Sequence, residues 1–172
     1  MAGTRRRVKR GGTARVTPVE WLLASDEPAI RGMARRDLLG VPADDELSRT
    51  TEGPMVRALL ADQQPDGGFG GHPYRKWTGA HWRLVSLVEL EVPAGEPRTM
   101  AAADRVLRWL TDPANLKPAR RIHGLPLSDA SIQGNALAAC SRLGIAEDPR
   151  VRLRGASRPR WWTGGERSRA AC

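Results

Sequence analysis

The stretch LLADQQPDGGFGGHPYRKWTGAHW, residues 59–82, constrains the fold of this chain more than any other segment. A helical pattern stops at Gln63, because Pro65 cannot continue a helix and the Asp-Gly-Gly run that follows is a turn sequence needing positive φ. The last 14 positions of the stretch hold four of the eight aromatic side chains in the chain. This composition predicts a compact joint between two helices.

Most of the chain has the periodicity of α-helices, with apolar residues three and four positions apart and Pro or Gly at the breaks. Thr17-Pro18-Val19-Glu20 has the pattern of a capping box with proline at the first helical position. No alternation of apolar and polar residues is long enough to predict a strand. We predict an all-α fold. The predicted helices begin at Thr17, span 26–40, 54–63, 78–92, 99–110 and 129–143, and begin again at Asp148.

The second predicted helix has two local signals. Asp26 is expected to be its N-cap and Gly40 its C-terminal stop. Its inward face is expected to consist of Ile30, Met33, Ala34 and Leu38. The polar residues 41–49 that follow are expected to form a loop before the next helix.

The formal net charge of +9 suggests a polyanionic partner, so the distribution of the basic residues matters. Residues 1–15 contain six basic and no acidic side chains, and residues 150–172 contain seven basic and one acidic. Residues 16–149 contain 15 basic and 18 acidic side chains, so the central part is mildly acidic. Because basic tails are usually solvated, nucleic acid is not favoured as the main partner.

At 172 residues the chain is long enough for one domain with a core. We expect this domain at 17–154, between a disordered basic tail at 1–16 and an irregular basic tail at 155–172. Cys140 and Cys172 are too few for a disulfide framework, and no apolar run approaches the roughly 18 residues that cross a bilayer. A cytoplasmic location is therefore expected.

Gln63-Gln64-Pro65-Asp66-Gly67-Gly68-Phe69-Gly70 resembles the Q-x-x-D-G-G-(F/W)-G repeat of the prenyltransferase and squalene-cyclase superfamily. The helix before it and the KWTGAHW segment after it stand where that repeat has its helices. The resemblance covers residues 17–154 and implies an α–α toroid, in which helical hairpins form two concentric rings around a cavity. In that family the motif reinforces the contact between repeats. The resemblance therefore implies a structural role for Gln63, Asp66, Gly67, Gly68 and Phe69.

The chain has about six or seven predicted helices, whereas a closed double ring of about ten to twelve needs on the order of 250–300 residues. We therefore expect an incomplete α–α toroid whose open helical edge exposes an apolar face to a protein partner or a second copy. A second motif falls at Trp161-Trp162-Thr163-Gly164-Gly165, but the Gln and Asp are missing and Glu166 replaces the closing aromatic residue. We interpret the C-terminal 18 residues as a decayed repeat or a frameshift, and the chain as a fragment.

Catalytic motifs of the superfamily are incomplete here. Cyclases use a buried aspartic acid in a D-x-D-D motif, whereas Ala43-Asp44-Asp45-Glu46 lacks the leading Asp and is interpreted as a solvated acidic turn. Protein prenyltransferases bind zinc through an Asp-x-Cys pair and a distant His, but two alanines precede Cys140, which is interpreted as a core residue. The spacing of His72, His81 and His123 matches no metal-ligand pattern. The sequence therefore predicts no catalytic residue, no metal and no cofactor.

Trp77 and Trp82 are the candidates for a cavity wall, because aromatic rings line cavities that stabilise carbocations. Their more ordinary role is to anchor the packing of two hairpins. His81 is expected to be a hydrogen-bonded interior or surface histidine.

The favoured function is that of a non-catalytic helical repeat protein similar to prenyltransferases and squalene cyclases. The first alternative is a terpenoid- or prenyl-processing subunit with an isoprenoid-like ligand, completed when two arcs form one ring. A HEAT-like scaffold is a further alternative, because residues 26–31 resemble residues 148–152. The last alternative is nucleic-acid binding through the basic tails.

Overall fold

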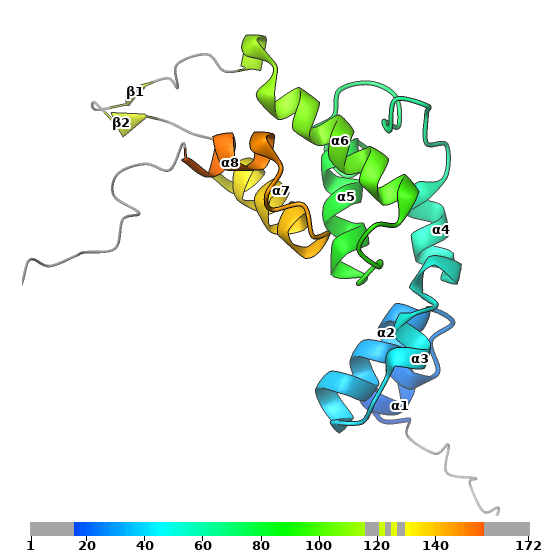
Figure 1. Ribbon diagram of the computed structural model, residues 1–172. Coiled ribbons are helices and arrows are strands. Elements are labelled where there is room, and N and C mark those ends of the chain that lie inside the picture. Colours follow the sequence, from blue (N-terminus) through cyan, green and yellow to red (C-terminus); the bar gives the residue numbers. More distant parts are fainter. Residues whose placement is uncertain (1–15, 116–120, 123–124, 127–129, 157–172) are drawn as a thin grey trace, which may run out of the picture.

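The computed structural model describes residues 16–115, 121–122, 125–126 and 130–156. These residues form an all-α protein with eight α-helices, which confirms the predicted class (Figure 1). The structure also contains an antiparallel pair of two-residue strands, β1 (Arg121–Ile122) and β2 (Leu125–Pro126), that the sequence did not predict. The predicted tails before residue 16 and after residue 156, His123 and the Trp161 segment lie outside the described residues.

The helices are short and are joined mostly by short connections. The α-helices are α1 (Pro18–Leu23), α2 (Pro28–Met33), α3 (Asp44–Leu47), α4 (Pro54–Leu60), α5 (Ala80–Glu89), α6 (Pro97–Thr111), α7 (Ala130–Arg142) and α8 (Pro149–Ala156). A π-helical segment, η1 (Ala34–Leu38), continues α2. Two 3-10 helices are η2 (Thr50–Glu52) and η3 (Pro113–Asn115). None of the helices in the described segments has the length and apolar composition that crossing a membrane requires.

Local sequence signals set several helix starts. Proline stands in the first turn of α1, α2, α4 and α6, where its missing N–H would have had no helical partner. The predicted capping box of α1 is confirmed: the Thr17 hydroxyl accepts from the Glu20 amide, and the Glu20 carboxylate accepts from the Thr17 amide at 2.7 Å. At α6 the carboxylate of Glu96 accepts from the amides of Arg98 and Thr99.

The prediction for the second helix was wrong in two respects. Glu27, not Asp26, occupies the N-cap of α2, and it makes no side-chain hydrogen bond to that helix. Leu38, predicted to face inward, is 56% exposed, because the π-helical turn of η1 adds residues to the turn and rotates the following side chains. Ala29 and Gly32 are buried in its place.

The segment predicted as a polar loop contains α3. Arg31 on α2 binds both carboxylate oxygens of Glu46, at 2.9 and 2.6 Å, and Arg35 binds Asp45 in the same way. These ion pairs join α3 to α2 and to η1, across 15 and 10 residues of sequence, so α3 depends on contacts that the local pattern does not reveal.

The helices α5, α6 and α7 pack around one apolar core. The apolar residues that recur at helical spacing in α5 and α6 are buried: Leu84, Leu87, Val88, Val106, Leu107 and Leu110. The small residues Ala136 and Ala139 bring α7 against this core. On the other side, α8 is held by a cluster of Leu107, Cys140 and Val151. Close packing of such small and branched side chains is what fixes three helices against one another.

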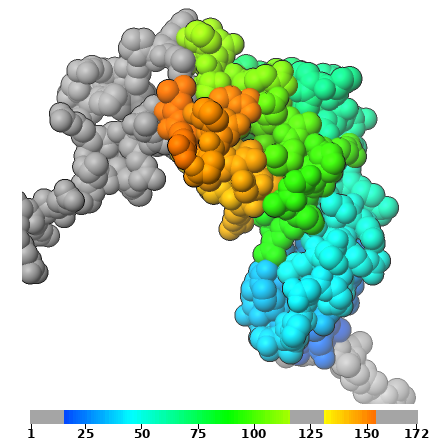
Figure 2. Space-filling view, in the orientation of Figure 1, coloured from blue at the N-terminus to red at the C-terminus, as the bar shows by residue number. Residues whose placement is uncertain are grey.

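A second cluster joins the N-terminal helices to α5. It is made of apolar side chains from α2, α4, α5 and the residues after α5: Ala29, Val56, Leu60, Leu87, Leu90 and Val92. The Arg36 guanidinium adds two contacts of 2.6 Å to the Glu91 carboxylate. The space-filling view shows the N-terminal helices extending from one end of the α5–α8 bundle, so the described molecule is elongated (Figure 2).

Candidate functional site

The loop between α4 and α5 carries the residues that the sequence singled out. Within it, the Gln64 amide donates to the Gly68 carbonyl at 2.8 Å, and the Gly67 amide donates to the Gln64 carbonyl at 2.9 Å. Gly67 has a φ of +81°, in the left-handed region that favours glycine. These bonds close a tight turn directly after the end of α4.

The turn lies against the backbone of α6. A Cβ added at Gly67 would lie 2.1 Å from the carbonyl oxygen of Ala101, which is far inside contact distance. No other residue type therefore fits at position 67 without moving α6 or the turn.

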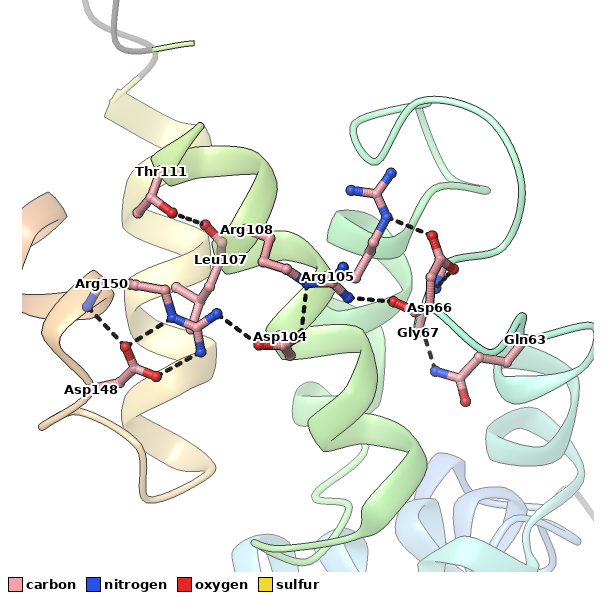
Figure 3. A network of polar contacts seen from close by, with 11 residues as sticks. Gln63, Asp66, Gly67, Asp104, Arg105, Leu107, Arg108, Thr111, Asp148 and Arg150 are labelled. Carbon is pink, nitrogen blue, oxygen red and sulfur yellow. Dashed lines mark hydrogen bonds and ion pairs between the residues drawn. The ribbon is translucent and has the colours of Figure 1, made fainter. Parts of the chain in front are cut away.

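Gln63 and Asp66 extend this contact along α6 (Figure 3). The Gln63 side-chain amide donates to the Arg98 carbonyl at 2.8 Å and to the Gly67 carbonyl at 3.3 Å. The Asp66 carboxylate accepts from the Gly68 amide at 2.8 Å and pairs with Arg105 at 3.1 Å. The partners of the Asp66 carboxylate are thus its own turn and the middle of α6.

The polar contacts continue across α6 to α8 (Figure 3). Arg108 donates to the Asp66 carbonyl at 2.7 Å and to the Asp104 carboxylate at 2.8 Å. Arg150 of α8 joins Asp104 at 2.7 Å to Asp148 at 2.8 Å. Hydrogen bonds from Arg150, and then from Arg108, lower the pKa of Asp104, and Arg150 likewise lowers the pKa of Asp148. One row of charged groups thus links the turn after α4 with the last described helix.

Phe69 closes the motif over α5. The Arg83 guanidinium lies 4.4 Å from the centroid of the Phe69 ring and donates to the Leu59 carbonyl at 2.7 Å and the Ala61 carbonyl at 3.3 Å. Arg98 also donates to the Leu60 carbonyl. Two arginines therefore satisfy the carbonyls that α4 leaves unpaired at its C-terminal end.

Trp77 and Trp82 contact each other, with ring centroids 5.0 Å apart. Trp82 is half-buried at the start of α5, whereas Trp77 is 67% exposed. Tyr74 continues the cluster inward, 5.9 Å from Trp82 and 6.1 Å from Trp109 of α6. The two predicted cavity-wall residues are thus brought together, at the outer edge of a larger group of rings.

His81 lies at the inner side of these rings and is 1% exposed. Its imidazole is 5.7 Å from the ring of Tyr74, 5.4 Å from that of Trp82 and 6.2 Å from that of Trp109. Among the described residues, neither ring nitrogen of His81 has a hydrogen-bond partner, and Nε1 of Trp82 and of Trp109 also lacks one. His81 is interior, which is one of the two positions expected for it. The hydrogen bond that was expected for it is absent among the described residues. Burial lowers the pKa of His81, because desolvation disfavours the imidazolium.

The acidic run at the start of α3 does not form an acid held neutral in an apolar pocket. Glu46 and Asp45 pair with arginines, and the hydrogen bonds from Arg31 lower the pKa of Glu46. Asp44 is exposed. The acidic run is therefore solvated and paired, in a short helix instead of the expected turn.

The remaining candidates are Cys140 and the histidines. Cys140 is buried in the α6–α7–α8 contact, and burial raises the pKa of its thiol to about 11. Within the described segments, no three His, Cys, Asp or Glu side chains lie close enough together to hold a metal ion.

Sequence reasoning missed Glu27. Its side chain is 1% exposed, and its carboxylate accepts from the Met55 amide at 2.7 Å, at the start of α4. Gly53, the N-cap of α4, offers no side chain, and a Cβ there would lie 1.7 Å from the Glu27 carboxylate. The second carboxylate oxygen has no partner among the described residues. Glu27 thus caps a helix that lies 28 positions further along the chain, and no local pattern signals this contact.

No family model, no curated protein and no solved structure matches this chain.

We predict that Gly67→Ala destabilises the protein more than Gly71→Ala does. Both positions have positive φ, which costs alanine about 1–2 kcal/mol, but nothing lies within 4 Å of a Cβ at Gly71. At Gly67 the clash with α6 adds about 1–3 kcal/mol. Urea unfolding of both variants measures the difference, and equal losses of unfolding free energy would show that the turn does not pack on α6.

We also predict that His81 makes the protein less stable as the pH falls. Its folded pKa lies below the ordinary histidine value of about 6.5, so below that pH the unfolded chain binds the proton more readily. The free energy of unfolding should fall by at most about 1.4 kcal/mol per pH unit from pH 6.5 down to the folded pKa.

Urea unfolding at a series of pH values above about 5, where ordinary carboxylates stay ionised, measures this slope. His81→Phe should remove it and His72→Asn, at an exposed histidine, should leave it unchanged. A wild-type slope that persists in His81→Phe would contradict the assignment.

Proposed function

We propose that this chain is a prenyltransferase- and squalene-cyclase-like helical repeat protein, an arc of an α–α toroid that binds a partner and performs no reaction. The observation that carries the proposal is how the motif residues are used: the side chains of Gln63 and Asp66 and the backbone of Gly67 all contact α6. A loop whose polar groups bind a neighbouring helix serves to connect one helical hairpin to the next.

The surroundings of Asp66 support a structural role. A carboxylic acid that protonates an alkene must be kept neutral in an apolar pocket. Asp66 instead has a side chain about half exposed, pairs with Arg105 and accepts a backbone amide. Asp45 and Glu46, the nearest match to an acid motif, are also paired with arginines.

The alternative is a terpenoid- or prenyl-processing subunit that is completed by oligomerisation. Contact between Trp77 and Trp82 favours it, because two adjacent indoles offer a π-surface to an isoprenoid-like ligand. In this alternative Trp77, which is exposed in a single chain, would become part of an enclosed wall.

The partner surface of the arc is expected at its N-terminal edge. An apolar groove of about 310 Å³ opens there between α1 and the continuous segment of α2 and η1, lined by Leu22, Ile30, Met33, Ala34, Asp37 and Leu38. Trp21, which is 70% exposed, borders a neighbouring groove of about 320 Å³. Leu39 and Val41 are exposed nearby in sequence. Apolar grooves and exposed apolar side chains of this kind are typical of an interface.

We predict that the chain self-associates through this edge and that Trp21→Glu abolishes the association, since it places a charge on the apolar surface. Trp77→Glu is the matched control, because Trp77 is exposed to nearly the same extent on the α4–α5 loop. Sedimentation velocity over a concentration series measures the assembly. A wild-type chain that stays monomeric at every concentration would contradict self-association through this edge.

The same samples distinguish the proposed non-catalytic arc from the alternative of an enzyme completed by oligomerisation. Squalene and an isoprenoid diphosphate are added to the wild-type chain, and the products are analysed by gas chromatography and mass spectrometry. The proposal expects unchanged substrate. Product formation by the self-associated form would favour the completed enzyme and contradict the non-catalytic arc.

A further inference from the structure

Trp77 occupies an unusual position for a tryptophan. Its side chain is 67% exposed and its φ is 67°, so a large apolar ring stands in solvent on a left-handed backbone. Both properties are unfavourable for this residue type. Strained residues persist mainly where the surrounding structure imposes them and where they serve a function.

The loop that presents Trp77 is held by its own hydrogen bonds. The Arg75 carbonyl accepts from the amides of Thr78, at 3.2 Å, and Gly79, at 2.7 Å. A Cβ on Gly79 would lie 2.4 Å from the Pro73 carbonyl oxygen, so the loop folds tightly onto itself. A loop whose backbone is fixed in this way loses little conformational freedom when it binds a ligand.

Two further rings support Trp77. The Trp82 ring lies 5.0 Å from the Trp77 ring, and the Tyr74 ring lies 5.9 Å from that of Trp82. Tyr74, Trp77 and Trp82 are called the aromatic platform here. The loop that carries most of it lies at the edge of the helical bundle, away from α1 and α2 (Figure 1).

The aromatic platform is bordered by positive charge. Arg75 and Lys76 immediately precede Trp77 and are exposed, and no carboxylate of the described residues pairs with either. The Lys76 ammonium lies 5.2 Å from the centroid of the Trp77 ring. Many other arginines of the chain, such as Arg31 and Arg36, are engaged by carboxylates. Lys76, whose ammonium lies over the exposed indole, and Arg75, two positions before Trp77 in the chain, therefore suit a ligand that is both flat and anionic.

We propose that the aromatic platform binds single-stranded nucleic acid, with a base stacked on Trp77 and the neighbouring phosphates contacted by Arg75 and Lys76. Every base has a π-face that stacks on an aromatic side chain, and the backbone phosphates supply the matching charge. The six basic residues within positions 1–15 add electrostatic attraction to phosphates, which does not depend on the base sequence of the nucleic acid. The basic residues alone do not favour nucleic acid over other anionic partners. The aromatic platform adds a surface on which a base can stack. The inference does not depend on the toroid proposal.

Other anionic partners fit these residues less well. An acidic peptide would satisfy Arg75 and Lys76 but would leave the indole of Trp77 without a stacking partner. A duplex carries the same phosphates, but its bases are stacked on one another and are not available to the platform. Binding should therefore favour a single strand over a duplex of equal length.

The test uses the full chain and a fluorescently labelled oligothymidylate, an unstructured single strand, with binding measured by fluorescence anisotropy over a salt series. Trp77→Ala should weaken binding by about 5- to 160-fold, which is the contribution of one stacked base. Met55→Ala, at an exposed apolar side chain on α4 that belongs neither to the aromatic platform nor to the grooves of the N-terminal edge, should leave the affinity unchanged. The Arg75→Gln, Lys76→Gln double variant should reduce the slope of log affinity against log salt by about 1.4, because each phosphate contact contributes about 0.7.

Three results would overturn the proposal. The first is no binding of the oligothymidylate at low salt. The second is equal affinity of Trp77→Ala and the wild-type chain, which would assign all binding to the basic tails. The third is competition by a duplex or by polyglutamate as strong as that by unlabelled oligothymidylate, which would show that the protein recognises negative charge only. Circular dichroism of each variant confirms that the helices are intact.

Discussion

The contact between Gly67 and the backbone of α6 is the constraint on which the rest of the arrangement depends. The turn after α4 comes so close to Ala101 that a single added carbon atom would lie 2.1 Å from its carbonyl oxygen. Gln63 and Asp66 can reach Arg98 and Arg105 because the turn lies so close to α6. The position of α4 relative to the α5–α8 bundle follows from this approach together with the apolar cluster between α4 and α5.

The helix α6 connects most of the described molecule because its two faces have different chemistry. Its buried face, with Val106 and Leu110, completes the core shared with α5 and α7. Its polar face, with Asp104, Arg105 and Arg108, joins the turn after α4 to α8 (Figure 3). A helix that is bound on opposite sides by neighbouring units is what a curved helical repeat requires, and the proposed arc rests on this property.

The parts that could be predicted from the sequence are those whose signals are local. The capping box at Thr17 and the buried positions of α5 and α6 follow from spacing alone. The cap that Glu27 supplies to α4 and the ion pairs that hold α3 come from residues distant in sequence, and no local pattern contains them. In the site, the pairing of Trp77 with Trp82 lay within reach of sequence reasoning. The left-handed backbone of Trp77 could not be predicted in this way, because tryptophan rarely adopts that conformation.

The central claim is that the turn around Gly67 is fastened to α6, and a nuclear Overhauser experiment on the labelled full chain tests it most directly. A Cβ at Gly67 would lie 3.3 Å from the Ala101 Cα, so an α-proton of Gly67 must lie within nuclear Overhauser range of the Ala101 α-proton. We expect a cross-peak between these two protons. Its absence, when the cross-peaks between α5 and α6 core residues are present, would show that the turn is detached from α6 and would contradict the account.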